Sequence, residues 1–238
     1  MLLTITWFPR SWVQIRTAGK IVYIDPAYMK VCFAGYPKKI EYSSWPDPID
    51  SLPEGLERGD IILVTHHHKD HCKRGTLKRL RRSDTLVLAP KRCRKELGEA
   101  MTTFGPGGKV SHDGVSIQAV PAYNTEHGSS THKQHRKGQG VGYLIAMEGR
   151  RLYHAGDTDF IPEMRELGEV DIAFLPIGGK FTMDISEAVE ATIAISPGAV
   201  VPIHRFGADQ RVFAQEVERK LGIPCLPLEI GQAHQLEA

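Results

Sequence analysis

The histidine-rich segment THHHKDH at residues 65–71 constrains this chain more than any other stretch. It directly follows the apolar run DIILV, which is typical of a buried strand, so its side chains should emerge at one edge of a sheet. In extended backbone His66 and His68 point to the same side and can bind one metal ion together. Asp70 and His71 then project from the following turn, close enough to serve a second ion. The spacing H-x-H-x-D-H therefore predicts a metal site.

The donor types in this segment indicate which kind of metal site it is. Imidazole and carboxylate without thiolate suit a catalytic Zn²⁺, Mn²⁺ or Fe²⁺ with an open position for water, rather than a closed structural zinc site. The four cysteines form no C-x-x-C pair, which argues against both a thiolate zinc site and a disulfide framework. We therefore expect reduced cysteines and a cytoplasmic setting. These cysteines are Cys32, Cys72, Cys93 and Cys225.

Length and composition favour an ordinary globular chain. With 238 residues, of which 41% are hydrophobic and 24% charged, the chain can bury its own core, and we expect one domain over residues 1–238. The N-terminal MLLTITWFPR lacks the basic start and apolar stretch of a signal peptide. No apolar run approaches the roughly 18 residues that a membrane helix needs. We expect a soluble, unprocessed protein with no membrane partner, and the oligomeric state is left open.

Positive charge is concentrated immediately after the histidine segment. Residues 69–95 carry eleven basic side chains, opposed only by Asp70 and Asp84. The commoner interpretation of such a run is the solvated face of two surface helices. The alternative is a rim that attracts anions, either phosphate groups of a small substrate or nucleic acid, beside the metal site.

Hydrophobic periodicity predicts how the chain is organised. The first three strands should form an antiparallel meander, and a Pro- and Ser-rich surface excursion should follow at 36–58. Asp113-Gly114 and Glu148-Gly149 mark the turns of two hairpins. Hairpins mixed with strand–helix units predict an α/β fold, a layered α+β sandwich of two sheets with helices outside them. Strands are expected at 2–8, 12–17, 21–26, 60–66, 85–90, 109–120, 140–157, 170–179 and 199–204, and helices at 75–82, 91–101, 161–167, 184–195 and 210–221.

A centre of two metal ions needs further ligands, which should come from the ends of other strands. Asp157 follows a strand in LYHAGDTDF, where the preceding glycine lets its carboxylate approach closely and bridge two cations. His204 ends another strand in VVPIHRF. The remaining ligand should come from the long polar loop 124–140, which we expect to line or cover the site. Its histidines are His127, His132 and His135.

The ordered set THHHKDH, YHAGDTD and PIHRF resembles the metallo-β-lactamase superfamily. The text VDIAFLPIGGKFTM is similar to that of its small metal-dependent hydrolases, the branch of L-ascorbate-6-phosphate lactonase. The resemblance extends from Ile5 to about Phe206. It implies a four-layer αββα sandwich with the metals at one edge between the sheets.

Two departures from the family pattern affect the expected ligand set. Many relatives have a Gly-His pair after the first strand, where this chain has Pro9-Arg10. Relatives also commonly place a metal histidine where this chain has Asn124. Similar sequences that read PAYN carry a later histidine before KGxGVGY, and this resemblance makes His135 the expected loop ligand.

The expected ligand set assigns three residues to each ion and one residue to both. His66, His68 and His135 would bind the first ion, Asp70, His71 and His204 the second, and Asp157 would bridge them. We expect zinc, with manganese or iron as alternatives. Such ions lower the pKa of bound water from about 15.7 toward about 7, which supplies hydroxide for attack on a carbonyl or phosphorus centre. Two of these residues would act catalytically. Asp157 would bridge the two ions, and Asp70 would orient the nucleophile or pass a proton to the leaving group.

Three residues near the proposed ligands have both a functional and a structural interpretation. Asp25, which ends a strand in YIDP, either accepts a hydrogen bond from a ligand histidine or simply forms a strand-end turn. His154 either supports Asp157 or is a core histidine with satisfied hydrogen bonds. Asp159 either supports Asp157 or caps the next helix.

Three functions remain open from the sequence. The first is a hydrolase acting on an ester, lactone or phosphoester small molecule, with the basic rim attracting an anionic substrate. The second is a nucleic-acid phosphodiesterase, which is disfavoured because residues 69–95 do not interleave basic with aromatic side chains and the chain has no room for a nucleic-acid clamp domain. The third is a non-catalytic metal-binding protein.

Overall fold

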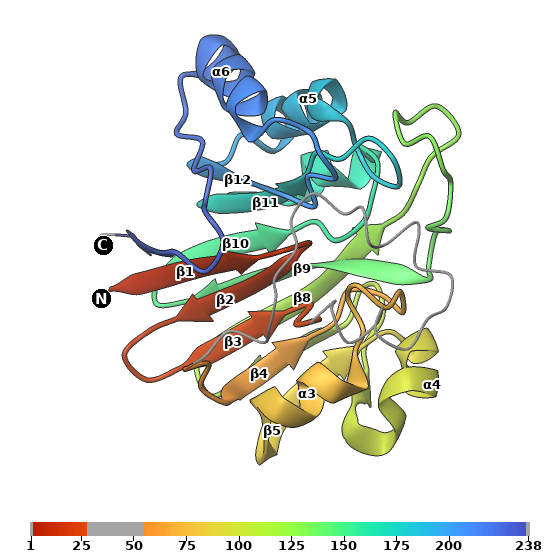
Figure 1. Ribbon diagram of the computed structural model, residues 1–238, viewed down its shortest axis with the longest axis vertical. Coiled ribbons are helices and arrows are strands. Elements are labelled where there is room, and N and C mark those ends of the chain that lie inside the picture. Colours follow the sequence, from red (N-terminus) through yellow and green to blue (C-terminus); the bar gives the residue numbers. More distant parts are fainter. Residues whose placement is uncertain (1, 28–54, 237–238) are drawn as a thin grey trace. The chain divides into compact units, whose positions relative to one another are not determined.

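The computed structural model describes residues 2–27 and 55–236 (Figure 1). The chain divides into two compact units: Met1–Thr103 with Glu229–Ala238, and Phe104–Leu228. The surface excursion predicted at 36–58 falls mostly on residues 28–54, outside the described ranges. The single domain expected over residues 1–238 stays a prediction.

A seven-stranded sheet forms the centre of the first unit, in the order β13-β1-β2-β3-β4-β5-β6. Strands β1, β2 and β3 pair antiparallel, as the predicted meander requires. From β3 to β6 the pairing is parallel. The strands are β1 Leu3–Phe8, β2 Trp12–Arg16, β3 Ile21–Ile24, β4 Gly59–Leu63, β5 Arg81–Ala89, β6 Thr102–Thr103 and β13 Ala233–Leu236.

Helical segments cover one face of this sheet. Leu77 and Leu80 of the helix α3 (Arg74–Leu80) and Leu97 of α4 (Arg94–Leu97) join one buried cluster with sheet residues such as Tyr23 and Ile62. The basic residues of both helices face outward, because the apolar positions are used for this packing.

Two predicted helices in the first unit differ from the observed ones. The helix predicted at 91–101 is split into the 3₁₀ segment η1 (Lys91–Cys93), α4 and a second 3₁₀ segment η2 (Gly98–Ala100). Gly98 has φ +65°, a conformation that ends an α-helix. The helix predicted at 75–82 ends at Leu80, because Arg81 already belongs to the next strand.

The second unit contains a six-stranded sheet in the order β12-β11-β10-β9-β8-β7. Both predicted hairpins are present, and their turn residues Asp113-Gly114 and Glu148-Gly149 all have positive φ, as tight two-residue hairpins require. Strands β10, β11 and β12 run parallel. The strands are β7 Lys109–His112, β8 Val115–Ala122, β9 Gly140–Met147, β10 Arg150–His154, β11 Ile172–Pro176 and β12 Ala199–Ile203.

Two longer helices pack on the second sheet. The helices α5 (Ile185–Ile195) and α6 (Gln210–Leu221) lie side by side next to β11 and β12 (Figure 1). The side chain of Asp184 caps α5, and Asp209 caps α6. The helix predicted at 161–167 is the 3₁₀ segment η3 (Pro162–Glu166). No helix within residues 2–27 and 55–236 is long and apolar enough to cross a membrane.

Each sheet brings chemically useful residues to one edge. Parallel strands end at the same edge of a sheet, so the residues that follow them gather there. In the first unit this places Asp25 after β3 beside Thr65 after β4, and the Asp25 amide donates to the Leu63 carbonyl at 2.8 Å. In the second unit Asp157 follows β10 and His204 follows β12.

Candidate metal centre

The histidine segment of the first unit forms a tight turn behind β4. The amides of His71 and Cys72 both donate to the carbonyl of His68, at 3.0 and 2.7 Å. This turn gathers the four side chains predicted as ligands. His66 Nε2 lies 3.0 Å from His68 Nδ1, the His66 and His71 rings lie 4.1 Å apart, and Asp70 Oδ2 lies 3.6 Å from His71 Nε2.

Asp25 determines which nitrogen of His71 is available to a metal. Its carboxylate is fully buried and accepts from Thr65 N at 2.7 Å, from Thr65 Oγ1 at 2.6 Å and from His71 Nδ1 at 2.7 Å. Because a carboxylate only accepts, Nδ1 of His71 carries the proton and Nε2 carries the lone pair. Asp25 holds this position with φ +48°, a conformation rare for a non-glycine residue and common at functional sites.

The residues between the expected ligands behave differently from one another. Lys69 is exposed, whereas His67 is half-buried. Burial lowers the pKa of His67 below its usual range, and the nearby positive charges of His68 and Arg92 lower it further. Cys72 is buried, and the pKa of its thiol is raised. The larger cause is a hydrogen bond with Cys93, and the second is burial.

The second unit directs two imidazoles at one carboxylate oxygen. His135 Nε2 lies 3.4 Å and His204 Nε2 lies 3.3 Å from Asp157 Oδ2, and all three side chains are buried. His204 has φ +45°. A Cβ on Gly178 would lie 2.5 Å from the His204 carbonyl oxygen, so this glycine permits the close approach of the chain after β11.

The loop between β8 and β9 distinguishes its three histidines. His127 and His132 are exposed, and the His132 ring packs against Phe181 with centroids 5.3 Å apart. His135 is only 7% exposed. The middle of this loop is attached by two backbone hydrogen bonds, from the Thr131 amide to the Gly179 carbonyl and from the His132 amide to the Lys180 carbonyl.

The structure bears on the two interpretations of Asp159 and of His154. Asp159 does not cap η3, whose N-cap is Ile161, so that interpretation is wrong. Its fully buried carboxylate accepts from Asn124, Thr125 and Lys133 instead. His154 is buried beside Phe174, and its Nδ1 accepts from the amide of Gly156 at 3.2 Å, as expected of a satisfied core histidine.

These donor atoms fit a metal ion by spacing as well as by type. Ligand atoms about 2.0–2.2 Å from a tetrahedral ion lie about 3.3–3.6 Å from one another. The two His–Asp157 separations of 3.4 and 3.3 Å and the His71–Asp70 separation of 3.6 Å fall within this range, whereas the His66–His68 separation of 3.0 Å is shorter. Nitrogen and oxygen donors of this kind accept several divalent ions, so the spacing fits zinc without selecting it.

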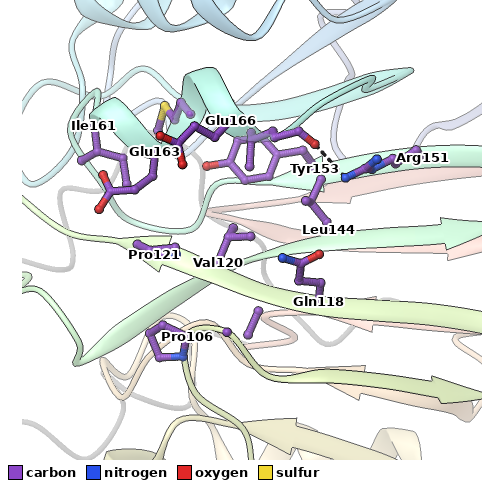
Figure 2. A pocket seen from close by; sticks show the side chains of 14 residues that line it. Pro106, Gln118, Val120, Pro121, Leu144, Arg151, Tyr153, Ile161, Glu163 and Glu166 are labelled. Atoms are coloured by element: carbon purple, nitrogen blue, oxygen red, sulfur yellow. Dashed lines mark hydrogen bonds between the residues drawn. The ribbon is translucent and has the colours of Figure 1, made fainter.

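A separate cleft of about 490 Å³ lies in the second unit between β8, β9, β10 and η3 (Figure 2). Val120, Leu144 and Tyr153 form part of its wall, and Arg151 donates to the Leu167 carbonyl at 2.7 Å beside it. Burial raises the pKa of Tyr153 above its usual range. None of the expected metal ligands lines this cleft.

Comparison with known proteins identifies the family. Residues 4–204 match the beta-lactamase superfamily domain. The chain belongs to this superfamily. A UPF0173 metal-dependent hydrolase of Thermoplasma acidophilum is a superfamily relative with 38% identity over 158 residues, which are 64% of this chain and 67% of that protein. Another, from Lysinibacillus sphaericus, is 33% identical over 231 residues, covering 91% of this chain and 93% of the relative.

A similar solved structure supports the same conclusion. Igni18, a metallo hydrolase of the archaeon Ignicoccus hospitalis, matches with a TM-score of 0.74 and 27% identity over the full length of both chains. The superfamily and the α/β metallo-β-lactamase fold predicted from the sequence are therefore confirmed. The protein is a metal-dependent hydrolase of this superfamily. The finer resemblance to L-ascorbate-6-phosphate lactonase stays a prediction.

Sequence reasoning missed several residues that shape the site. Thr65 donates two hydrogen bonds to the Asp25 carboxylate. It lies next to the histidine segment, but no sequence pattern indicates this role. Lys133 ion-pairs with the buried Asp159 at 3.0 Å across 26 residues, a separation that no local pattern encodes. The sequence marks Asn124 only as the residue that stands in place of a ligand histidine, and it does not indicate the contacts of its side chain.

Proposed function

We propose that this hydrolase uses two divalent metal ions, zinc in the first instance, to cleave an ester, lactone or phosphoester bond of a small molecule. The proposed ligands are those expected from the sequence, and the allocation to the two ions follows the same expectation. They are His66, His68, Asp70, His71, His135, Asp157 and His204.

The convergence on Asp157 is the observation that carries this proposal. Two imidazole nitrogens, one from the loop between β8 and β9 and one from the residue after β12, lie within 3.4 Å of one buried carboxylate oxygen. A buried carboxylate is costly unless it is paired or coordinates a metal. Neutral imidazoles that offer lone pairs to such an oxygen would repel it, whereas two cations, each held between one imidazole and the shared carboxylate, would stabilise all three groups.

The chain's own residues would orient the reaction around the bound ions. When bound, divalent ions supply an acidified water as nucleophile and a Lewis acid for the developing negative charge. Asp25 holds His71 so that Nε2 carries the lone pair. Asp70, at the turn beside His71 and partly exposed, would orient a nucleophile or pass a proton to the leaving group.

An anionic substrate is favoured by the basic surface of η1 and α4. Lys91, Arg92 and Lys95 are exposed there, and the charge of Arg92 reaches His67 in the metal-binding turn. Arg82 of the same basic region pairs with Asp60 and Asp84. The exposed cations would raise the local concentration of a carboxylate- or phosphate-bearing substrate.

A nucleic-acid phosphodiesterase on the same centre remains the second candidate, because the same basic surface would attract a polyanion. Binding to RNA or DNA that falls steeply between low and physiological salt would favour it over the small-molecule hydrolase. We also propose a reducing, cytoplasmic setting, which is consistent with the free thiols of Cys72, Cys93 and Cys225.

The deciding experiment measures metal content and hydrolysis together. Wild-type protein reconstituted with Zn²⁺ or Mn²⁺ is screened against lactones, phosphodiesters and phosphomonoesters. His68→Ala and Asp157→Ala should each lose at least one ion and the hydrolytic activity while remaining folded. His112→Ala, a histidine on the hairpin strand β7, is the matched control and should retain both. Full metal occupancy in both ligand variants would refute the assignment.

A further inference from the structure

Asn124 lies between the end of β8 and the expected ligand His135. Its backbone amide donates to the His135 carbonyl at 2.7 Å, and the His135 amide donates back to Asn124 Oδ1 at 2.8 Å. The same Oδ1 lies 3.1 Å from His135 Nδ1. One asparagine side chain therefore contacts both the backbone and the ring of the histidine.

The orientation of the Asn124 amide follows from its other contacts. Its Nδ2 donates to Asp159 Oδ1 at 3.2 Å and to the Phe181 carbonyl at 2.9 Å, and both of these groups can only accept. A flipped amide would place its oxygen against two acceptors and its NH₂ against the His135 amide. The amide oxygen must therefore face His135.

This orientation determines the protonation of the His135 ring. Nδ1 faces two acceptors, Asn124 Oδ1 and the Phe181 carbonyl, each at 3.1 Å. A ring nitrogen opposite two acceptors carries the hydrogen, so the neutral ring has its lone pair on Nε2. Nε2 is the atom that lies 3.4 Å from Asp157.

An ion pair between the exposed Lys133 and the buried Asp159 keeps Asn124 in place. Asp159 Oδ2 accepts from the Thr125 amide at 2.9 Å and from Lys133 Nζ at 3.0 Å, and Lys133 also donates to the Gly128 carbonyl at 2.7 Å. A Cβ on Gly128 would lie 2.1 Å from Asp159 Oδ2, so only glycine leaves room for this carboxylate. The two ends of the loop are thereby linked through Asp159.

We propose that Asn124 is a positioning residue that fixes His135 in its Nδ1–H tautomer and so presents Nε2 to the metal. The part of this inference that concerns metal binding rests on the proposed function. The tautomer follows from the hydrogen bonds alone. It gives the asparagine that stands in place of a ligand histidine a role of its own. Asn124 orients the ligand that the loop supplies instead.

The test begins with the metal-free, full-length protein. A two-bond ¹H–¹⁵N correlation spectrum at about pH 8.5, well above the usual imidazole pKa of about 6.5, reports the tautomer of each histidine. His135 should be the Nδ1–H form in the wild type. Asn124→Leu leaves only the Phe181 carbonyl opposite Nδ1 and should shift the ring toward a mixture of tautomers, whereas Gln134→Ala, an exposed neighbour in the same loop, should leave it unchanged.

Metal affinity gives the second readout. Zn²⁺ affinity, measured by competition with a chelator, should fall about 10- to 100-fold in Asn124→Leu and stay unchanged in Gln134→Ala. An Nε2–H tautomer of His135 in the wild type overturns the inference, and so does an unchanged tautomer in Asn124→Leu. If the wild type binds no Zn²⁺, the proposed function fails, while the tautomer of the metal-free protein still decides the role of Asn124.

Discussion

Asp25 both orients the proposed ligand His71 and stabilises the fold. Replacing Asp25 by Asn should separate these two roles. The carboxylate accepts three buried hydrogen bonds, two from Thr65 and one from His71. An amide of the same shape offers one acceptor oxygen. With that oxygen toward the Thr65 backbone amide, the NH₂ faces His71 Nδ1. The His71 proton must then move to Nε2, the atom that would bind metal.

The expected magnitudes follow from these three bonds. A hydrogen bond to a charged group contributes about 1 kcal/mol more than a neutral one, so the free energy of unfolding should fall by about 3 kcal/mol. For a chain of this length that corresponds to a melting temperature lower by about 6–12 °C. Zn²⁺ affinity should fall about 10- to 100-fold, because a metal-binding histidine loses the partner that sets its tautomer.

The assay pairs thermal unfolding of the metal-free protein with chelator competition for Zn²⁺. Asp60→Asn is the matched control, since Asp60 also accepts a backbone hydrogen bond in the first sheet and pairs with Arg82. It should lower stability without changing metal affinity. If Asp25→Asn loses stability as expected and still binds Zn²⁺ as tightly as wild type, the reasoning about His71 is wrong.

Three further predictions follow from the second unit and the basic surface. Among single alanine replacements of the loop histidines His127, His132 and His135, only the last should lose a metal ion by elemental analysis; loss in either of the others instead would reassign the ligand. Asp159→Ala should lower the free energy of unfolding by about 2–3 kcal/mol in urea denaturation, because it removes the buried carboxylate that accepts from Asn124, Thr125 and Lys133; a change below about 0.5 kcal/mol would contradict this. Lys95→Glu should raise KM for an anionic substrate about two- to five-fold at unchanged kcat, an effect that should vanish in high salt; a KM unaffected at low salt would remove the basic surface from the proposal.

Local signals account for most of the fold that the sequence predicted. The hairpin turns Asp113-Gly114 and Glu148-Gly149 could be located because positive φ at both positions favours particular residues. The strand β13 was missed, because Ala233–Leu236 is defined by pairing with β1 at the other end of the chain. The split of the helix expected at 91–101 was missed as well, since hydrophobic spacing does not distinguish an α-helix from 3₁₀ segments.

The candidate site divides in the same way. The clustering of the expected ligands in the turn after β4 follows from spacing within seven residues, and the positions of Asp157 and His204 follow from the strands that precede them. The supporting contacts could not, because they join residues far apart in the chain. Asn124 reaches Asp159 across 35 residues, and Asp25 reaches His71 across 46. Such pairs depend on the register of folded strands rather than on any neighbouring sequence.

The missing side chain at Gly128 has a consequence for how this loop can evolve. Its backbone needs no unusual conformation, so the restriction is purely one of space against Asp159. A larger residue at 128 would displace the Asp159 carboxylate, which accepts three hydrogen bonds. A shorter residue at 159 would lose those hydrogen bonds. Positions 128 and 159 should therefore tolerate paired replacement better than single changes, and a combinatorial library randomised at both would recover the coupling directly.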